Sequence, residues 1–145
     1  MELNILRADP AGNITVFVLD PVEKAQRAAI AEKIMAIPAL KAEQVGYACA
    51  AEDDVDGHME MMGGEFCGNA TRAYGMYIAQ QKGGLSAVKL RVSGCDHAVT
   101  AQVDLRSGTA RAEMPCPRSV KRVTVNGHEG TLVDLTGIAH FVVEG

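Results

Sequence analysis

The sequence predicts an α+β fold in which a β-sheet is wrapped around a central buried helix. Short segments that alternate apolar and polar residues recur along the chain, as expected for strands with one buried face. Only two segments have helical character, and one of them is apolar around most of its circumference, so protein must surround it. The chain has 145 residues, of which 48% are hydrophobic, which is enough for one domain with a packed core.

The first part of the chain is predicted to form a hairpin followed by a helix. Strands at 3–8 and 14–19 flank a segment with the Asp, Pro, Gly and Asn residues typical of turns. Asp20 is then expected to cap a helix that has Pro21 at its first position, and Pro38 ends that helix.

The second helix is expected to run from Gly68 to Lys82, with Gly83 and Gly84 as its stop. Alanine, tyrosine, methionine and isoleucine cover most of its surface. Gly75 in its middle has no side chain, which lets a strand backbone approach closely. This helix is therefore expected at the centre of the fold.

Strands make up most of the remaining chain. The strand at 88–92 alternates apolar and basic residues with a period of two. Asn126 followed by Gly127 is a strong signal for a two-residue hairpin turn. Further strands are predicted at 44–50, 58–62, 97–104, 109–114, 121–125, 132–135 and 140–143.

Composition excludes several classes of function. The net charge of −4 leaves no basic face for phosphates, so we expect no nucleic-acid partner. No apolar stretch approaches the ~20 residues that cross a bilayer, and the first residues do not resemble a signal peptide. We therefore expect a cytoplasmic protein without a membrane partner, whose thiols stay reduced.

Cys67 stands at the predicted N-cap of the second helix. The amides of Gly68, Asn69 and Ala70 belong to the first turn and have no partners within the helix. With the positive end of the helix dipole, these amides form a site suited to a carboxylate, and the same field stabilises a thiolate. A sulfur beside such a site is suited to removing the proton next to the bound carboxylate. From the residues alone, the alternative that Cys67 only packs in the core stays open.

Cys67-Gly68-Asn69-Ala70, followed by Arg72, resembles the active-site signature of the diaminopimelate epimerase family of amino-acid racemases and epimerases. This segment is the specific part of a resemblance that covers most of the chain. The other matching segments support it.

Three other regions carry the supporting resemblance. Asn13 matches an early residue that lines the family's substrate pocket, and Gln44, preceded by Glu43, matches a substrate-facing Gln. The segment at 113–114 resembles the part that closes the first lobe. The segment at 137–143 resembles the crossing into a second lobe.

The resemblance implies a mechanism and a domain organisation. Members of the family have two similar lobes, each an antiparallel sheet around a central helix, with the substrate between them. Residues 1–145 would then be a single N-terminal lobe, with Cys67 as its catalytic thiol, and the second lobe would supply the other thiol. The amides of Gly68, Asn69 and Ala70 would bind the substrate carboxylate, with no pyridoxal phosphate, other cofactor or metal. The isolated lobe is expected to be inactive.

Two departures from the family concern the substrate. His58, expected to contact the substrate, takes the place of an Asn that binds the far end of diaminopimelate, and Ile138 replaces another such Asn. Because each missing polar partner costs ~1–3 kcal/mol, we expect a different amino acid as substrate. The segment Met-Gly-Gly-Glu-Phe-Cys-Gly-Asn is also similar to the histidine racemases of metallophore biosynthesis, which makes histidine the candidate.

Three other functions stay as alternatives. The first is a true diaminopimelate epimerase, and the second is a proton-shift isomerase of a small dicarboxylate. The third is a non-catalytic domain that binds a carboxylate. Glu65, beside the predicted helix start, either orients the substrate or is a solvated loop carboxylate.

The second thiol is not identified in this chain. Cys49, Cys95 and Cys116 are not followed by a glycine-rich helix start, so we expect them to be structural. The simplest interpretation is that the chain is part of one about twice as long. A homodimer that sets Cys67 against its symmetry mate is the alternative.

Overall fold

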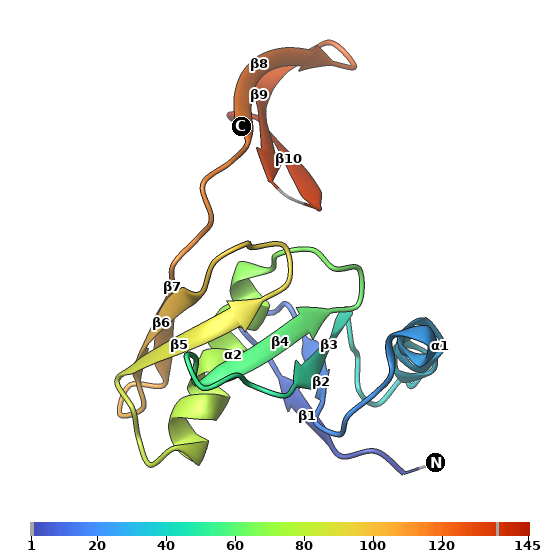
Figure 1. Cartoon of the computed structure of the whole chain (residues 1–145). Helices are drawn as coiled ribbons and strands as arrows, with labels where there is room; N and C mark the ends of the chain where they lie inside the picture. The colour runs from blue at the N-terminus through green and yellow to red at the C-terminus, as the bar shows by residue number, and fades with distance from the viewer. Residues whose placement is uncertain (1, 136) are drawn as a thin grey trace.

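The computed structural model describes residues 2–135 and 137–145, which form two sheets and two helices (Figure 1). None of the helices in these residues is long and apolar enough to cross a membrane. The elements are β1 (Ile5–Ala8), β2 (Thr15–Val18), α1 (Lys24–Met35), β3 (Gln44–Cys49), β4 (Gly57–Met61), α2 (Gly68–Gln81), β5 (Ala87–Val92), β6 (Val99–Asp104), β7 (Thr109–Ala112), β8 (Ser119–Val125), β9 (His128–Leu135) and β10 (Ile138–Val142).

The larger sheet has seven strands in the order β1 to β7, and it is mixed rather than antiparallel. The pairs β2–β3 and β4–β5 are parallel, whereas the other four pairs are antiparallel. The expectation of an antiparallel sheet was therefore wrong for these two pairs. The reason is that α1 lies between β2 and β3 in the chain and α2 lies between β4 and β5. A helix between neighbouring strands returns the chain to the same end of the sheet, so the second strand runs parallel to the first.

Helix α2 packs against strands β4 to β7 of the curled sheet. Tyr74, Gly75 and Ile78 are on its buried side, whereas Met76 and Tyr77 are only partly buried. A Cβ on Gly75 would lie 2.7 Å from Cβ of Ala101, so the close approach of helix and sheet requires glycine there. The α+β class is confirmed, and one side of α2 is less enclosed than its composition predicts.

Helix α1 covers the opposite face of the sheet, so β2 is buried on both faces. The predicted cap was wrong: α1 begins at Lys24 after Glu23, and neither Asp20 nor Pro21 belongs to it. The Asp20 carboxylate instead accepts hydrogen bonds from the backbone and side-chain amides of Asn4. These bonds lower the pKa of Asp20 and hold the N-terminal segment beside the end of β2.

Strands β8 to β10 form a separate antiparallel sheet beyond β7 (Figure 1). Asn126 and Gly127 have φ values of 49° and 79° at the β8–β9 turn, as the predicted two-residue hairpin requires. The smaller sheet approaches the larger part of the molecule at Gly137. There, a Cβ on Gly137 would lie 3.2 Å from Cα of Glu65.

Candidate active site

Cys67 is the N-cap of α2, as predicted. Its backbone is extended, with φ −131° and ψ 112°, and its sulfur accepts a hydrogen bond from the Ala70 amide at 3.4 Å. Its carbonyl oxygen accepts hydrogen bonds from the amide and the hydroxyl of Thr71. Helix geometry therefore fixes the sulfur at the positive end of α2, and Cys67 is only partly buried.

The helix start leaves two donors for a ligand. The Ala70 amide is used by the sulfur, whereas the amides of Gly68 and Asn69 have no acceptor among the residues that the structure describes. The three-amide site expected from the sequence is thus reduced to two free amides. Two neighbouring N–H groups at a helix start suit the two oxygens of a carboxylate.

Gln44 supplies a second donor to the sulfur. It stands at the first position of β3, and its Nε2 lies 3.2 Å from Sγ of Cys67. The same nitrogen lies 2.7 Å from Oγ1 of Thr15 and 3.1 Å from Oδ1 of Asn13. Because Nε2 of Gln44 carries two hydrogens, they are shared among three acceptors: Oγ1 of Thr15, Oδ1 of Asn13 and Sγ of Cys67. The Gln44 side chain and the Ala70 amide thus both direct N–H groups at Sγ.

Asn13 links Gln44 to the helix start. Its Oδ1 accepts from Gln44 and, at 3.2 Å, from Nδ2 of Asn69, while its Nδ2 donates to Oε2 of Glu43 at 2.8 Å. Arg72 completes the chain of contacts, since its Nη2 lies 2.6 Å from Oδ1 of Asn69. The predicted site residues Asn13, Gln44 and Asn69 are thus connected by hydrogen bonds.

A cleft of about 490 Å³ opens beside Cys67. Strand β7 and the segment after it form one wall, and the small sheet contributes Leu135, Ile138 and His140. The lining combines polar and apolar side chains, as in pockets that bind small molecules. The residues lining the cleft are Asn13, Gln44, Glu65, Phe66, Cys67, Gly68, Asn69, Arg72, Ala112, Met114, Leu135, Ile138 and His140.

His58 is not brought to this cleft. It lies on β4, where Met59 and Met61 face the core around α2, so His58 and Glu60 face the other side of the sheet. His58 there pairs with Cys49 in the strand register, and its Nε2 lies 3.6 Å from a carboxylate oxygen of Glu60. The two-residue period of a strand excludes His58 from the face that bears the methionines.

Cys49, His58 and Glu60 lie close enough together to suggest a metal site. The guanidinium of Arg27, however, already forms an ion pair with Glu60 and a contact of 3.7 Å with the sulfur of Cys49. Burial and the Glu60 charge raise the pKa of the Cys49 thiol and favour its protonated form. The charge of the Glu60 carboxylate is thus balanced by Arg27.

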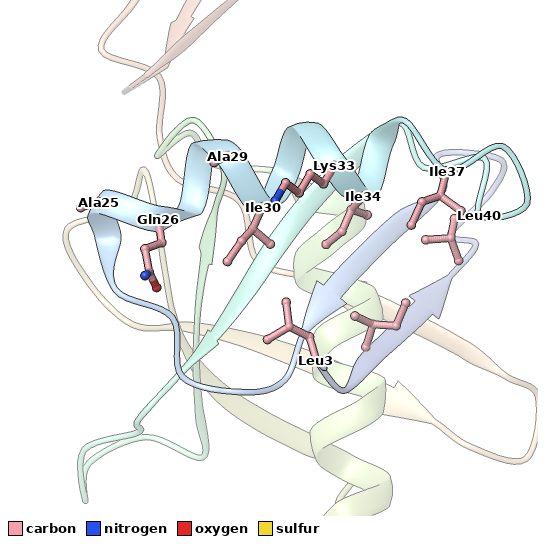
Figure 2. Close-up of a pocket in the computed structure, with 10 residues that line it drawn as sticks. Leu3, Ala25, Gln26, Ala29, Ile30, Lys33, Ile34, Ile37 and Leu40 are labelled. Atoms are coloured by element: carbon pink, nitrogen blue, oxygen red, sulfur yellow. The ribbon is translucent and has the colours of Figure 1, made fainter. Parts of the chain in front are cut away.

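A larger cavity of about 610 Å³ lies between α1 and the N-terminal segment (Figure 2). Figure 2 shows the side chains of Leu3, Ile30 and Ile34 directed into the space between α1 and β1. Its only polar lining groups among the described residues are Gln26 and Lys33. It lacks a pair of acid and base groups, so the cleft beside Cys67 is the stronger candidate for a reactive site.

Several contacting residues were not among those predicted for the site. Glu43 directly precedes Gln44, and Arg72 is three positions after Asn69, where helical side chains are neighbours. Those two positions could have been inferred from the sequence. Met114 and His140 depend on how the segment after β7 and the small sheet fold over the cleft, which local patterns do not reveal.

Comparisons with known proteins agree on one family. Residues 2–145 match the family described as "Histidine racemase CntK N-terminal domain". The chain is 33% identical over 149 residues to a histidine racemase of Fusobacterium nucleatum subsp. nucleatum, which covers 97% of this chain and 54% of that protein. A histidine racemase of Staphylococcus aureus (strain Mu50) is 33% identical over 122 residues, or 81% of this chain and 44% of that protein. The chain spans about half the length of the curated relatives it matches.

Proposed function

The chain belongs to the histidine racemase N-terminal domain family, and from this premise we propose that it is the first lobe of a cofactor-independent histidine racemase in which Cys67 is one of two acid/base thiols. Family membership supports an amino-acid racemase, and the names of the relatives support histidine as its substrate. They do not favour the diaminopimelate, dicarboxylate or non-catalytic alternatives.

The observation that carries the proposal is the environment of the Cys67 sulfur. Sγ receives N–H groups from Gln44 and Ala70 while Cys67 borders an open cleft. A group that removes a proton must be ionised and must reach the substrate. Two donors stabilise the thiolate, and the cleft gives it access to a bound amino acid.

The free amides of Gly68 and Asn69 position the substrate. In the proposed complex they bind the α-carboxylate, which places the α-carbon near Cys67. The Cys67 thiolate then takes the α-proton and becomes a thiol. Negative charge that moves onto the carboxylate during this step is stabilised by the same two amides and by the helix dipole.

Inversion requires a second proton donor on the opposite face of the α-carbon. Cys49, Cys95 and Cys116 do not line the cleft, so we propose that the second thiol comes from a second lobe. The relatives are about twice as long as this chain, which leaves room for such a lobe. The homodimer that would place two copies of Cys67 face to face stays a prediction.

We also propose that the reaction proceeds without pyridoxal phosphate. That cofactor is held as a Schiff base by a lysine. No lysine is among the described residues that border the cleft. We therefore expect racemisation to continue in the presence of hydroxylamine, which captures pyridoxal phosphate.

The proposal is tested by proton exchange in the full-length protein. L-Histidine in D2O should lose its α-proton signal and yield D-histidine, and Cys67→Ser should abolish the formation of D-histidine, which requires both thiols. Cys116→Ser is the matched control, because Cys116 is exposed and lies outside the cleft. D-Histidine formation that persists in Cys67→Ser, or wild-type protein that leaves histidine unchanged, contradicts the proposal.

A further inference from the structure

We propose that Glu65 determines substrate specificity by accepting a hydrogen bond from the side-chain N–H of the amino acid whose α-proton Cys67 removes. This inference rests on the proposed function and assigns a role to a residue that the proton transfer does not use. It predicts a preference for planar side chains that carry a nitrogen-bound proton, as imidazole does.

Glu65 is the only carboxylate among the described residues that line the cleft. The other ionisable side chains there are Cys67, Arg72 and His140, and Arg72 is hydrogen-bonded to Asn69. The carboxylate of Glu65 receives no hydrogen bond and no ion pair from residues 2–135 and 137–145, so its acceptor oxygens are open to a ligand.

The backbone of Glu65 is held firmly, which a specificity residue requires. Oγ of Ser93 donates to the carbonyl oxygen of Glu65 at 2.7 Å and accepts from the Met61 amide at 2.8 Å. Gly94 packs so closely that a Cβ there would lie 2.2 Å from the amide nitrogen of Phe66. The loop is thus anchored to β4 and to the segment after β5.

Glycines leave room on both sides of Glu65. A Cβ on Gly63 would lie 2.6 Å from Oε2 of Glu65, and one on Gly137 would lie 3.2 Å from its Cα. The Glu65 carboxylate therefore lies over Gly63, and the turn between β9 and β10 passes next to its backbone. Larger residues at these positions would displace it.

The rest of the cleft wall suits the flat, apolar parts of a ring. Phe66, Met114, Leu135 and Ile138 provide apolar surface in the same cleft. With the α-carboxylate at the start of α2, the substrate side chain extends into this cleft. A ring nitrogen that donates to Glu65 there meets the one carboxylate among the described residues of the cleft. An acidic side chain would instead be repelled.

The α-ammonium group is a competing partner for Glu65, and the test must separate the two roles. Oε1 of Gln44 accepts no hydrogen bond from the described part of the chain and offers an alternative acceptor for the ammonium. If Glu65 bound the ammonium, its loss would slow every amino acid alike. If Glu65 binds the substrate side chain, its loss should slow only those substrates whose side chain carries a hydrogen-bond donor.

The experiment compares L-histidine with L-β-(2-thienyl)alanine, which has a five-membered ring without an N–H group. Deuterium exchange at the α-carbon is measured for the full-length wild type, Glu65→Ala and Glu65→Gln. We expect Glu65→Ala to reduce kcat/KM for histidine by roughly 10- to 100-fold and to leave thienylalanine nearly unchanged. Glu65→Gln keeps an acceptor oxygen and a similar shape, so it should restore part of the histidine preference.

Glu52→Gln is the control, because Glu52 is exposed in the loop before β4 and is not part of the cleft. Circular dichroism confirms that each variant is folded. An equal loss for both substrates, or no loss in Glu65→Ala, overturns the inference while the thiol mechanism stands. Wild-type protein that exchanges thienylalanine but not histidine also overturns it. Absence of exchange with every amino acid overturns the proposed function and this inference with it.

Discussion

The side-chain amide of Gln44 lies 3.2 Å from the sulfur of Cys67, although 23 residues separate them in the chain. Gln44 begins β3, and Cys67 is the residue before α2. The contact joins the first residue of an interior strand to the start of the helix. It gives the sulfur one donor that does not depend on helix geometry.

Removing this donor should make Cys67 less reactive. Gln44→Leu deletes the hydrogen bond that the Gln44 side chain donates to the Cys67 thiolate. Because a hydrogen bond to a charged group contributes about 1.5–3 kcal/mol, we expect iodoacetamide to alkylate Cys67 roughly 10-fold or more slowly in this variant. Mass spectrometry of the modified peptides measures the rate. Cys116 in the same sample is the internal control, since it is exposed and has no contact with Gln44. An unchanged rate at Cys67 would show that Gln44 does not stabilise its thiolate.

Glu43 should act through Asn13. Glu43→Leu removes the acceptor for Nδ2 of Asn13, which frees the Asn13 side chain to turn and disturbs its bonds to Gln44 and Asn69. Because Glu43 is exposed, we expect only about a 2- to 10-fold fall in kcat for histidine, with Glu43→Gln close to wild type because it keeps an acceptor. Steady-state kinetics of the full-length protein test this. Equal activities of Glu43→Leu and Glu43→Gln would contradict a positioning role.

The position of Cys67 was predictable because a helix start is a local feature. Glycines, a small polar residue and an apolar run within eight residues define both the end of the loop and the direction of α2. The stop at Gly83 and Gly84 was predictable for the same reason, and both have positive φ values. Features set by a few neighbouring residues therefore carried most of the correct predictions.

Features that depend on pairing between distant segments of the chain were harder to predict from the sequence. The parallel pairs in the large sheet follow from where the helices cross, which strand periodicity alone does not determine. His58 was expected in the substrate pocket from its spacing to Cys67. Its alternation with Met59 already indicated the opposite face, because Met59 is a core residue. The alternation of side chains along β4, rather than the spacing between His58 and Cys67, determines which face of the sheet His58 occupies.

The contact between α2 and the sheet at Gly75 should tolerate no larger residue. In Gly75→Ala the new methyl would lie 2.7 Å from Cβ of Ala101. Overpacking of this kind costs about 1–3 kcal/mol, which exceeds the gain of up to ~1 kcal/mol in helix propensity. We expect a lower midpoint in urea unfolding monitored by circular dichroism. Gln80→Ala, at an exposed position of the same helix, should change stability by less than about 0.5 kcal/mol. A Gly75→Ala protein as stable as wild type would show that the helix can move away from β6.

The ion pair between Arg27 and Glu60 should make stability depend on acidity. Burial opposes ionisation of Glu60, but its hydrogen bond and attraction to Arg27 outweigh burial and lower the pKa of Glu60 below its ordinary value of 4.5. A carboxyl group with a lowered pKa in the folded state stabilises the fold above the pKa of the unfolded chain. That contribution is lost as the pH falls through the lower folded value. The free energy of unfolding should therefore drop between pH 6 and pH 3 by less in Glu60→Gln than in wild type, as measured by urea titration at each pH. Glu52→Gln controls for the loss of an exposed carboxylate. If the free energy of unfolding drops equally in Glu60→Gln and in wild type, the ion pair adds nothing to stability.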